Sequence, residues 1–371
     1  LIQVTEIFAT VDYLESELNI LLIDEPDSHI HLALQKRLMS NLKSLTDNQS
    51  FIITHNDGFV NETINGELFY LNQNALASNI LRQLENADLI KKDFGSPILT
   101  LEKLNASDNI VFVEGSDDKV YIEKLLERYL ELNITSNSQN LKKCFYFKIR
   151  GKDDLNNKLD YNRRTLSQLF NDKKYVVITD KDFTSIQKNT QLNDKIKQKL
   201  GKTSEAFCHD GYCIESTLLS DLNKLHKYLA YLTSHSFSSI ETQSNQILEQ
   251  MLYESQNVTS LRYRNYQQQL NSQKNNRPEL ASTMISEVIT DATKDINTLK
   301  FLMNKNTIRE YINSLESKCS ISIVPNGLSF SDEEFCNKLF LQYINGIPSH
   351  GILYQNHKMI LEKIYDVNFL E

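Results

Sequence analysis

Four carboxylate residues stand where they could act together on a metal ion or a phosphate. Glu114 directly follows a short apolar run, and Asp118 comes four residues later. Asp180 and Asp182 follow a second apolar run, and strand alternation predicts that they share one face. If the two runs are neighbouring strands, the four carboxylates meet at the carboxyl edge of a sheet, where such sheets bind ligands. Their mutual repulsion then predicts a site for Mg²⁺ or Mn²⁺.

The residues before these acids predict the elements that must position them. Residues 110–113, 144–149 and 175–179 are short apolar runs rich in β-branched and aromatic residues, and the first is followed by a helical pattern. This order predicts a small parallel sheet with right-handed crossovers. Residues 184–204 are charged and indicate a loop.

The sequence VEGSDD, which contains Glu114 and Asp118, and the later TDKD, which contains Asp180 and Asp182, together resemble the Toprim signature. The resemblance implies that Glu114, Asp180 and Asp182 are catalytic and that all four residues hold metal. Either motif alone would be equally typical of an ordinary strand–helix unit.

Two further residues are candidates for the same site. The stretch GYCIESTLL around Glu215 resembles an element that follows the second motif in Toprim domains of OLD-family nucleases and of PARIS-type defence effectors, where the Glu lies near the metals. Here Ser216 stands where Asn is common, and Glu215 could instead begin a helix. Lys152 could contact a phosphate as a catalytic residue, or could be a solvated loop lysine.

A second pair of motifs near the start of the chain is typical of a nucleotide site. Asp24 and Glu25 end an apolar strand, as in a Walker B motif, where the Asp holds Mg²⁺ and the Glu polarises the attacking water. His55 ends the next apolar strand, where it can reach a γ-phosphate. LLIDEPDSHIHL and FIITHN resemble ABC-type ATPases of the SMC/RecF-like branch, which implies ATP as a cofactor.

The phosphate-binding loop that such a site needs does not occur in the sequence. No GxxxxGK[ST] is present, and the only GKT, at residues 201–203, lacks the preceding glycine and strand. In ABC-type ATPases the loop precedes Walker B, so we expect it before residue 1. The chain as given should then bind ATP weakly or not at all; a degenerate half serving as a dimer platform is the alternative.

Composition restricts the remaining possibilities. The net charge of −8 and pI of about 5.6 argue against a generally basic nucleic-acid-binding surface. Cys208, His209 and Cys213 make a poor zinc ligand set, and the five cysteines predict reduced thiols and a cytoplasmic protein. No apolar run is long enough for a membrane span, and no signal peptide is visible.

The C-terminal part has helical periodicity and one basic stretch. Residues 255–278 contain no Asp or Glu, and their basic residues alternate with Tyr263 and Tyr266. Such a stretch could hold a nucleic-acid backbone while the tyrosine rings stack on bases, or it could be a polar surface helix. The candidate nucleic-acid-binding residues are Arg262, Arg264, Lys274 and Arg277.

These observations predict an α/β protein that resembles OLD-family nucleases, in which an ABC-type ATPase domain precedes a Toprim domain. The expected segments are the C-terminal half of an ATPase domain (1–74), a connector (75–107), a Toprim Rossmann-like parallel sheet (108–220) and a mostly helical region (221–371).

The resemblance implies an Mg²⁺-dependent endonuclease regulated by ATP, acting in bacterial anti-phage defence. It also implies a homodimer or larger assembly, with a further protein or RNA partner possible. DNA and tRNA both stay open as substrates. There are two alternatives. The metal site could serve a topoisomerase or a primase, or the protein could be a non-catalytic sensor or scaffold that is switched by ATP.

Overall fold

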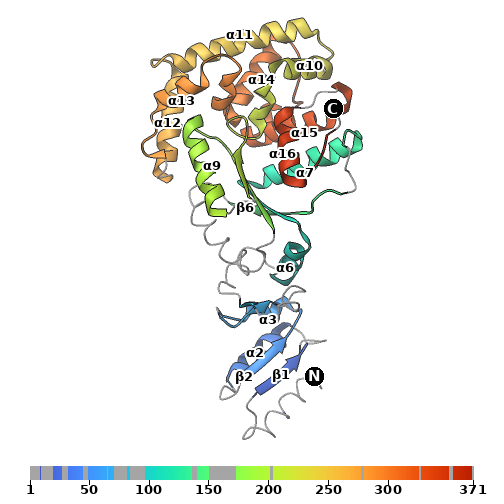
Figure 1. Cartoon of the computed structure of the whole chain (residues 1–371). Coiled ribbons are helices and arrows are strands. Elements are labelled where there is room, and N and C mark those ends of the chain that lie inside the picture. The colour runs from blue at the N-terminus through green and yellow to red at the C-terminus, as the bar shows by residue number, and fades with distance from the viewer. Residues whose placement is uncertain are drawn as a thin grey trace. The chain divides into compact units, whose positions relative to one another are not determined.

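The computed structural model has two compact units, and among the described residues the division falls between Ala106 and Ser107 (Figure 1). Among the described residues, no helix has both the length and the apolar character needed to cross a bilayer. The described residues are residue 9 and the ranges 20–26, 32–44, 49–64, 66–70, 82–83, 97–135, 140–149, 173–200, 204–276, 280–325, 327–350 and 354–369.

The first unit is built on two parallel strands, β1 (Ile20–Asp24) and β2 (Gln49–Ile53), which are hydrogen-bonded neighbours. Helices α2 (Leu32–Ser44) and α3 (Asp57–Asn61) pack together beside them. Ile23, Leu38, Met39, Leu42 and Phe59 form its small apolar core. The remaining described elements of this unit are the antiparallel strands β3 (Phe69–Tyr70) and β4 (Arg82–Gln83), and helix α6 (Pro97–Ala106).

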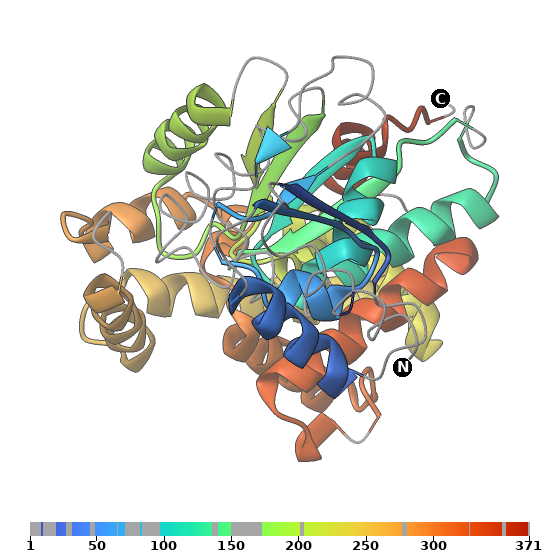
Figure 2. The ribbon, with the colours of Figure 1, turned by 90° about the horizontal axis from the view of Figure 1, so that it is seen from below.

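The second unit is built on a four-stranded, fully parallel sheet in the order β6–β5–β7–β8. Strand β5 (Asn109–Val113) is buried along its whole length, as the apolar run predicts. Its neighbours are β6 (Cys144–Lys148) and β7 (Lys174–Thr179), and β8 (Glu205–Cys208) lies at the far edge. Figure 2 shows the green strands β7 and β8 side by side.

Helices surround this sheet and make up the rest of the second unit. Helices α7 and α16 contact β5, and α9 contacts β8. The helical elements are α7 (Ser116–Glu131), α9 (Ile186–Leu200), η2 (Glu215–Ser220), α10 (Leu222–Thr233), α11 (Phe237–Gln256), α12 (Leu261–Asn276), α13 (Ile285–Ala292), η4 (Thr298–Leu302), α14 (Lys305–Cys319), η5 (Gly327–Ser329), α15 (Asp332–His350) and α16 (Gln355–Tyr365).

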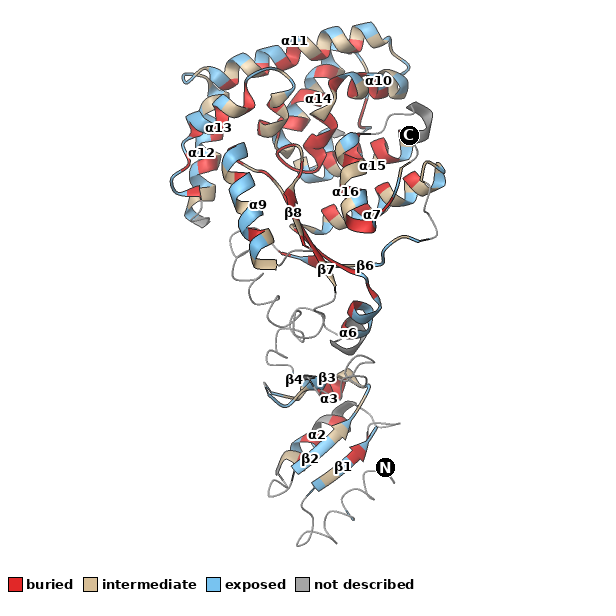
Figure 3. Cartoon of the chain, viewed as in Figure 1, coloured by how far each residue is buried: buried red, intermediate tan, exposed pale blue. Residues whose placement is uncertain are grey.

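One continuous apolar core joins the sheet to the C-terminal helices. Val111 and Val176 of the sheet belong to the same buried cluster as Leu229, Ile312 and Leu361 of the helices. Figure 3 shows this burial as red along the strands and along the inward sides of α14 and α15. The predicted mixed α/β fold with parallel strands and a helical C-terminal part is confirmed. The boundary expected at residue 220 lies inside this one unit.

The loop predicted over residues 184–204 is wrong, because most of that range forms helix α9. Asn189 and Ile196 are its buried residues, and Leu192, Ile196 and Leu200 are spaced four residues apart, as on one side of a helix. The many charged and amide residues between them made the segment resemble a loop in the sequence. Contact with β8 fixes the helix instead, and β8 itself is too short to stand out in the sequence.

Two buried histidines predict how stability depends on pH. His226 bonds Ser244 (2.6 Å) and His357 bonds Thr217 (2.9 Å). Burial lowers the pKa of His226 to about 4 and that of His357 to about 3, from an ordinary value near 6.5. Below pH 6.5 the unfolded chain therefore binds protons that the folded chain excludes, and stability is lost as the pH falls.

Between pH 6.5 and 4 each histidine should lower the free energy of unfolding by about 1.4 kcal/mol per pH unit. Urea denaturation across this range measures the slope, and His226→Gln should make it shallower than that of the wild type. His235→Gln is the control, because His235 is partly exposed. A His226→Gln slope equal to the wild-type slope would contradict the account.

Candidate metal centre and nucleotide-binding motif

Three adjacent parallel strands of the second unit each end in a residue that can bind a cation. Glu114 follows β5, Asp180 follows β7 and His209 follows β8. The Glu114 Oε2 atom accepts a hydrogen bond from the backbone N–H of Asp180 (2.8 Å). The predicted convergence of acids from separate strands at one sheet edge is therefore present for Glu114 and Asp180.

Asp118 joins this group from the first turn of α7. Its Oδ2 atom accepts a hydrogen bond from the Gly115 N–H (2.9 Å), while its Oδ1 atom lies 3.5 Å from His209 Nε2. The side chain is buried, and the helix N-terminus favours its negative charge. One ligand atom each from Asp118, Asp180 and His209 lie within 4.8 Å of one another, a spacing compatible with a shared metal ion.

Glu215 reaches the same place from the first position of η2, where it is 1% exposed. The turn before it is closed by Ser216, whose Oγ atom accepts from the Cys213 N–H (3.0 Å) and donates to the Cys213 carbonyl oxygen (2.7 Å). Gly211 permits this turn, because a Cβ atom there would lie 3.1 Å from the Ser216 carbonyl carbon and collide with its hydroxyl. Ser216 thus holds the Glu215 backbone without the Asn common in similar sequences.

Glu114, Asp118, Asp180 and Glu215 line one pocket of about 200 Å³. Its single described cationic side chain is Lys305, at the first position of α14. Lys305 Nζ lies 3.1 Å from Glu215 Oε1, and 3.8 Å from carboxylate oxygens of Asp117 and Glu333. The acidic lining residues are Glu114, Asp117, Asp118, Asp180, Glu215 and Glu333.

The negative charge of these carboxylates raises the pKa values of neighbouring side chains. Burial by itself would lower the pKa of Lys305, but Glu215 outweighs it and the pKa is raised. Burial first, and then Glu215, raise the pKa of the Tyr121 hydroxyl and the Cys213 thiol. The pocket therefore strongly favours positive charge, as a cation site must.

Asp182 does not line this pocket, although the sequence predicts that it shares a face with Asp180. Strand β7 ends at Thr179, so alternation does not extend to residue 182, and the shared-face prediction is wrong. The backbone N–H groups of Lys181 and Asp182 both donate to the Tyr212 carbonyl oxygen (3.1 Å each), and Asp182 has a φ of +50°. Its charge acts on Tyr212 instead: burial, followed by Asp182, raises that hydroxyl's pKa.

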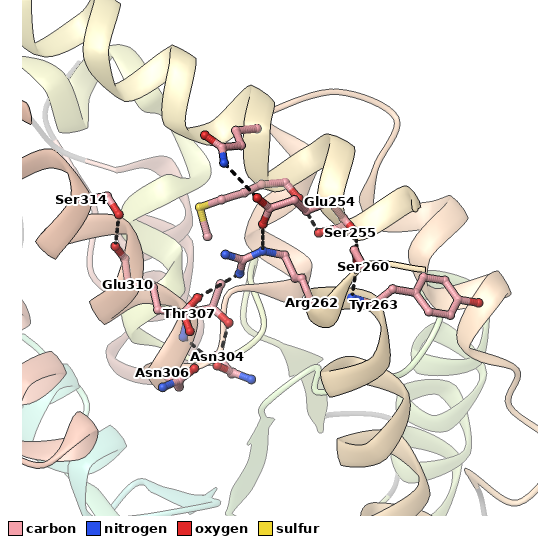
Figure 4. A network of polar contacts seen from close by, with 12 residues as sticks. Glu254, Ser255, Ser260, Arg262, Tyr263, Asn304, Asn306, Thr307, Glu310 and Ser314 are labelled. Carbon is pink, nitrogen blue, oxygen red and sulfur yellow. Dashed lines mark hydrogen bonds and ion pairs between the residues drawn. The ribbon is translucent and has the colours of Figure 1, made fainter. Parts of the chain in front are cut away.

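The basic stretch forms helix α12, and its first arginine has an internal role. Arg262 bonds Glu254 Oε2 (3.0 Å) and Glu310 Oε2 (3.1 Å), which ties α12 to α11 and α14 (Figure 4). Tyr266 is 2% exposed and packs on Phe183, so its ring is closed to a base. Arg262 and Tyr266 therefore stabilise the fold.

The other basic candidates differ in what they offer a nucleic acid. Arg264 is exposed and donates to the carbonyl oxygens of Ser260 (3.2 Å) and Thr259 (3.1 Å). Lys274 is partly exposed near the end of α12. For these two, nucleic-acid binding stays a prediction. Arg277 and Lys152 lie outside the described residues.

In the first unit, the nucleotide-site candidates lie at the ends of two paired strands. Asp24 ends β1 opposite Ile53 of β2, and the Glu25 N–H donates to the Ile53 carbonyl oxygen (2.8 Å). Glu25 has a φ of +44°, and its Oε1 atom lies 3.9 Å from His55 Nε2. Both side chains are more than half exposed, so they are accessible to a ligand.

The surroundings of the cysteines disfavour thiolate ligands for zinc. All five are free thiols. Cys208 Sγ lies in hydrogen-bonding contact with Thr179 Oγ1 (3.1 Å), and the raised pKa of Cys213 opposes the thiolate that zinc requires.

Sequence reasoning missed several charged or metal-binding residues of the pocket region as site residues, namely Asp117, His209, Lys305 and Glu333. His209 directly follows a strand, as Glu114 and Asp180 do, so recognition of the short β8 segment would have found it. Lys305 has no comparable signal, because it begins a helix 90 residues beyond Glu215 in the sequence and reaches the pocket through tertiary packing.

Comparisons with known proteins bear on the first unit. Residues 7–61 match the family model described as "AAA domain, putative AbiEii toxin, Type IV TA system". No curated protein sequence matches the chain. The matched range includes Asp24, Glu25 and His55. The chain therefore contains an AAA-like ATPase fragment in its first unit.

Proposed function

We propose that the second unit is a metal-dependent phosphodiesterase that cleaves nucleic acid, and that the ATPase fragment belongs to its nucleotide control. The observation that carries the proposal is the pocket at the carboxyl edge of the parallel sheet, where Glu114, Asp118, Asp180 and Glu215 converge from three separate segments of the sequence. The Toprim resemblance of the surrounding motifs supports the same assignment.

The donor set of the pocket fits a hard divalent cation. Six carboxylate residues and one lysine are among its described lining residues, so the site has a large excess of negative charge. Carboxylate oxygens are the ligands that Mg²⁺ and Mn²⁺ prefer, and clustered carboxylates stay ionised only when cations compensate them. Asp118 and Asp180 would hold the ion, with Glu114 and Glu215 beside them.

The residues of the pocket would position the metal ligands and bind the substrate phosphate. A bound divalent ion would activate water and stabilise charge on the scissile phosphate. The Asp180 N–H holds the Glu114 carboxylate in place, and Gly115 holds Asp118. Lys305 is about one third exposed, so its ammonium group can meet a phosphate oxygen at the pocket mouth while Glu215 anchors it.

Nucleotide control is proposed from the first unit. Asp24 is the proposed Mg²⁺ ligand of a bound nucleotide, Glu25 the base and His55 the sensor of the γ-phosphate. The AAA family match and the 3.9 Å approach of Glu25 to His55 support this assignment. By resemblance, the protein would act as a homodimer or larger assembly in anti-phage defence.

Incubation of the purified chain with single- and double-stranded DNA and with tRNA, in Mg²⁺, Mn²⁺ or EDTA, tests the proposal. We expect cleavage with a divalent cation, none in EDTA, and loss of cleavage in Glu114→Gln. Glu127→Gln is the matched control, because Glu127 is an exposed carboxylate on α7 outside the pocket. Cleavage by Glu114→Gln at the wild-type rate, or cation binding without any cleavage, would overturn the proposal in favour of an ATP-switched scaffold.

A further inference from the structure

The ring of His209 is buried close to Asp118 and Asp180. The residue is 3% exposed, and neither Nδ1 nor Nε2 makes a hydrogen bond within the described part of the chain. A buried imidazole without hydrogen bonds is costly, so native proteins rarely retain one unless it serves a ligand. The Nε2 atom lies 3.5 Å from the Oδ1 atom of Asp118.

The spacing of the three side chains suits ligands of one ion. Two ligand atoms about 2.1 Å from a metal are about 3 Å apart when adjacent and about 4.2 Å apart when opposite. The ligand atoms of Asp118, Asp180 and His209 all lie within 4.8 Å of one another. Asp118 and Asp180 are among the residues that line the pocket, and His209 is not.

We propose that Asp118, Asp180 and His209 form an inner cation site with one nitrogen and two oxygen ligands, which selects a divalent transition-metal ion over Mg²⁺. The proposal rests on the proposed function and narrows its cofactor. Mg²⁺ strongly prefers oxygen ligands, whereas imidazole nitrogen suits first-row transition metals. Mn²⁺ is the useful probe, because it accepts both ligand types and is paramagnetic.

A competing role for His209 is to position Asp118 through a hydrogen bond. The two atoms are 3.5 Å apart and form no hydrogen bond, and Asp118 already has a positioning partner in Gly115. A positioning histidine would leave no nitrogen on the metal. The two roles therefore differ in a property that spectroscopy measures directly.

Pulsed electron paramagnetic resonance of the chain with substoichiometric Mn²⁺ tests the proposal. We expect nitrogen hyperfine modulation from one imidazole, a changed pattern when histidine is labelled with ¹⁵N, and no modulation in His209→Gln. His226→Gln is the matched control, because His226 is equally buried but bonds Ser244 outside the pocket, and it should keep the signal. Bound Mn²⁺ without nitrogen modulation in the wild-type chain would overturn the proposal, and that result requires no variant to fold.

Calorimetric titration gives the selectivity. Mn²⁺ should bind the wild-type chain at least about tenfold more tightly than Mg²⁺, and His209→Gln should lose most of that difference. An unchanged ratio in His209→Gln would also overturn the inference. Failure of this inference alone would leave cleavage and cation binding intact without nitrogen coordination, whereas failure of the proposed function would remove cleavage itself.

Discussion

Asp180→Asn is expected to lower cation-dependent cleavage by at least about a thousandfold, equivalent to about 4 kcal/mol of transition-state stabilisation. Asn keeps the shape of the side chain and the backbone N–H that bonds Glu114, so the pocket should keep its form. What is lost is the negative charge next to Asp118 and His209. Initial rates under single-turnover conditions, with saturating Mn²⁺, measure the effect.

Asp182→Asn is the matched comparison, because it makes the same change in the same motif. Asp182 lies outside the pocket lining, so the cleavage rate of Asp182→Asn should be no more than about tenfold below that of the wild type. The motif resemblance alone would assign both aspartates equal weight. Equal losses in the two variants would mean that the chain around residues 180–182 adopts a different conformation when substrate is bound.

Lys305→Met should lower the free energy of unfolding by about 2 to 3 kcal/mol in EDTA. Glu215 is buried, and removal of the ammonium 3.1 Å away leaves its charge uncompensated. Loss of one partner of a fully buried pair costs about 3 to 5 kcal/mol, and the partial exposure of Lys305 reduces this. Urea denaturation measures the change. Added Mn²⁺ should recover part of it, because the cation supplies the missing positive charge.

Two further variants separate this ion pair from general effects of the helix. Lys318→Met removes an exposed lysine from the same helix, α14, and should change stability by less than about 0.5 kcal/mol. Lys305→Met combined with Glu215→Gln should recover most of the lost stability, because no unpaired charge remains. Additive losses in the double variant would show that the two side chains do not interact.

The strands and the acids at their ends could be predicted because both signals are local. Runs such as 110–113 and 175–178 are almost entirely apolar, as is typical of strands buried on both faces, and the residue after each strand lies at the ligand edge of a parallel sheet. This reasoning located Glu114 and Asp180 correctly relative to each other.

The parts that could not be predicted depend on tertiary contacts. Asp182 departs from the expected face because its backbone N–H donates a hydrogen bond to the Tyr212 carbonyl oxygen, 30 residues away in the sequence. Arg262 looked like a nucleic-acid contact because its partners, Glu254 and Glu310, lie on other helices. Lys305 enters the pocket only through the packing of α14, which no local pattern encodes.

The central claim is that carboxylates from separate elements, Asp118 of α7 and Asp180 after β7, hold one divalent cation. Anomalous diffraction from a crystal soaked in Mn²⁺ tests this claim most directly. The account predicts a manganese peak within bonding distance of Asp118 and Asp180, which disappears in crystals of Asp180→Asn. A well-diffracting soaked crystal with no peak in this pocket, or with a peak that persists in Asp180→Asn, would contradict it.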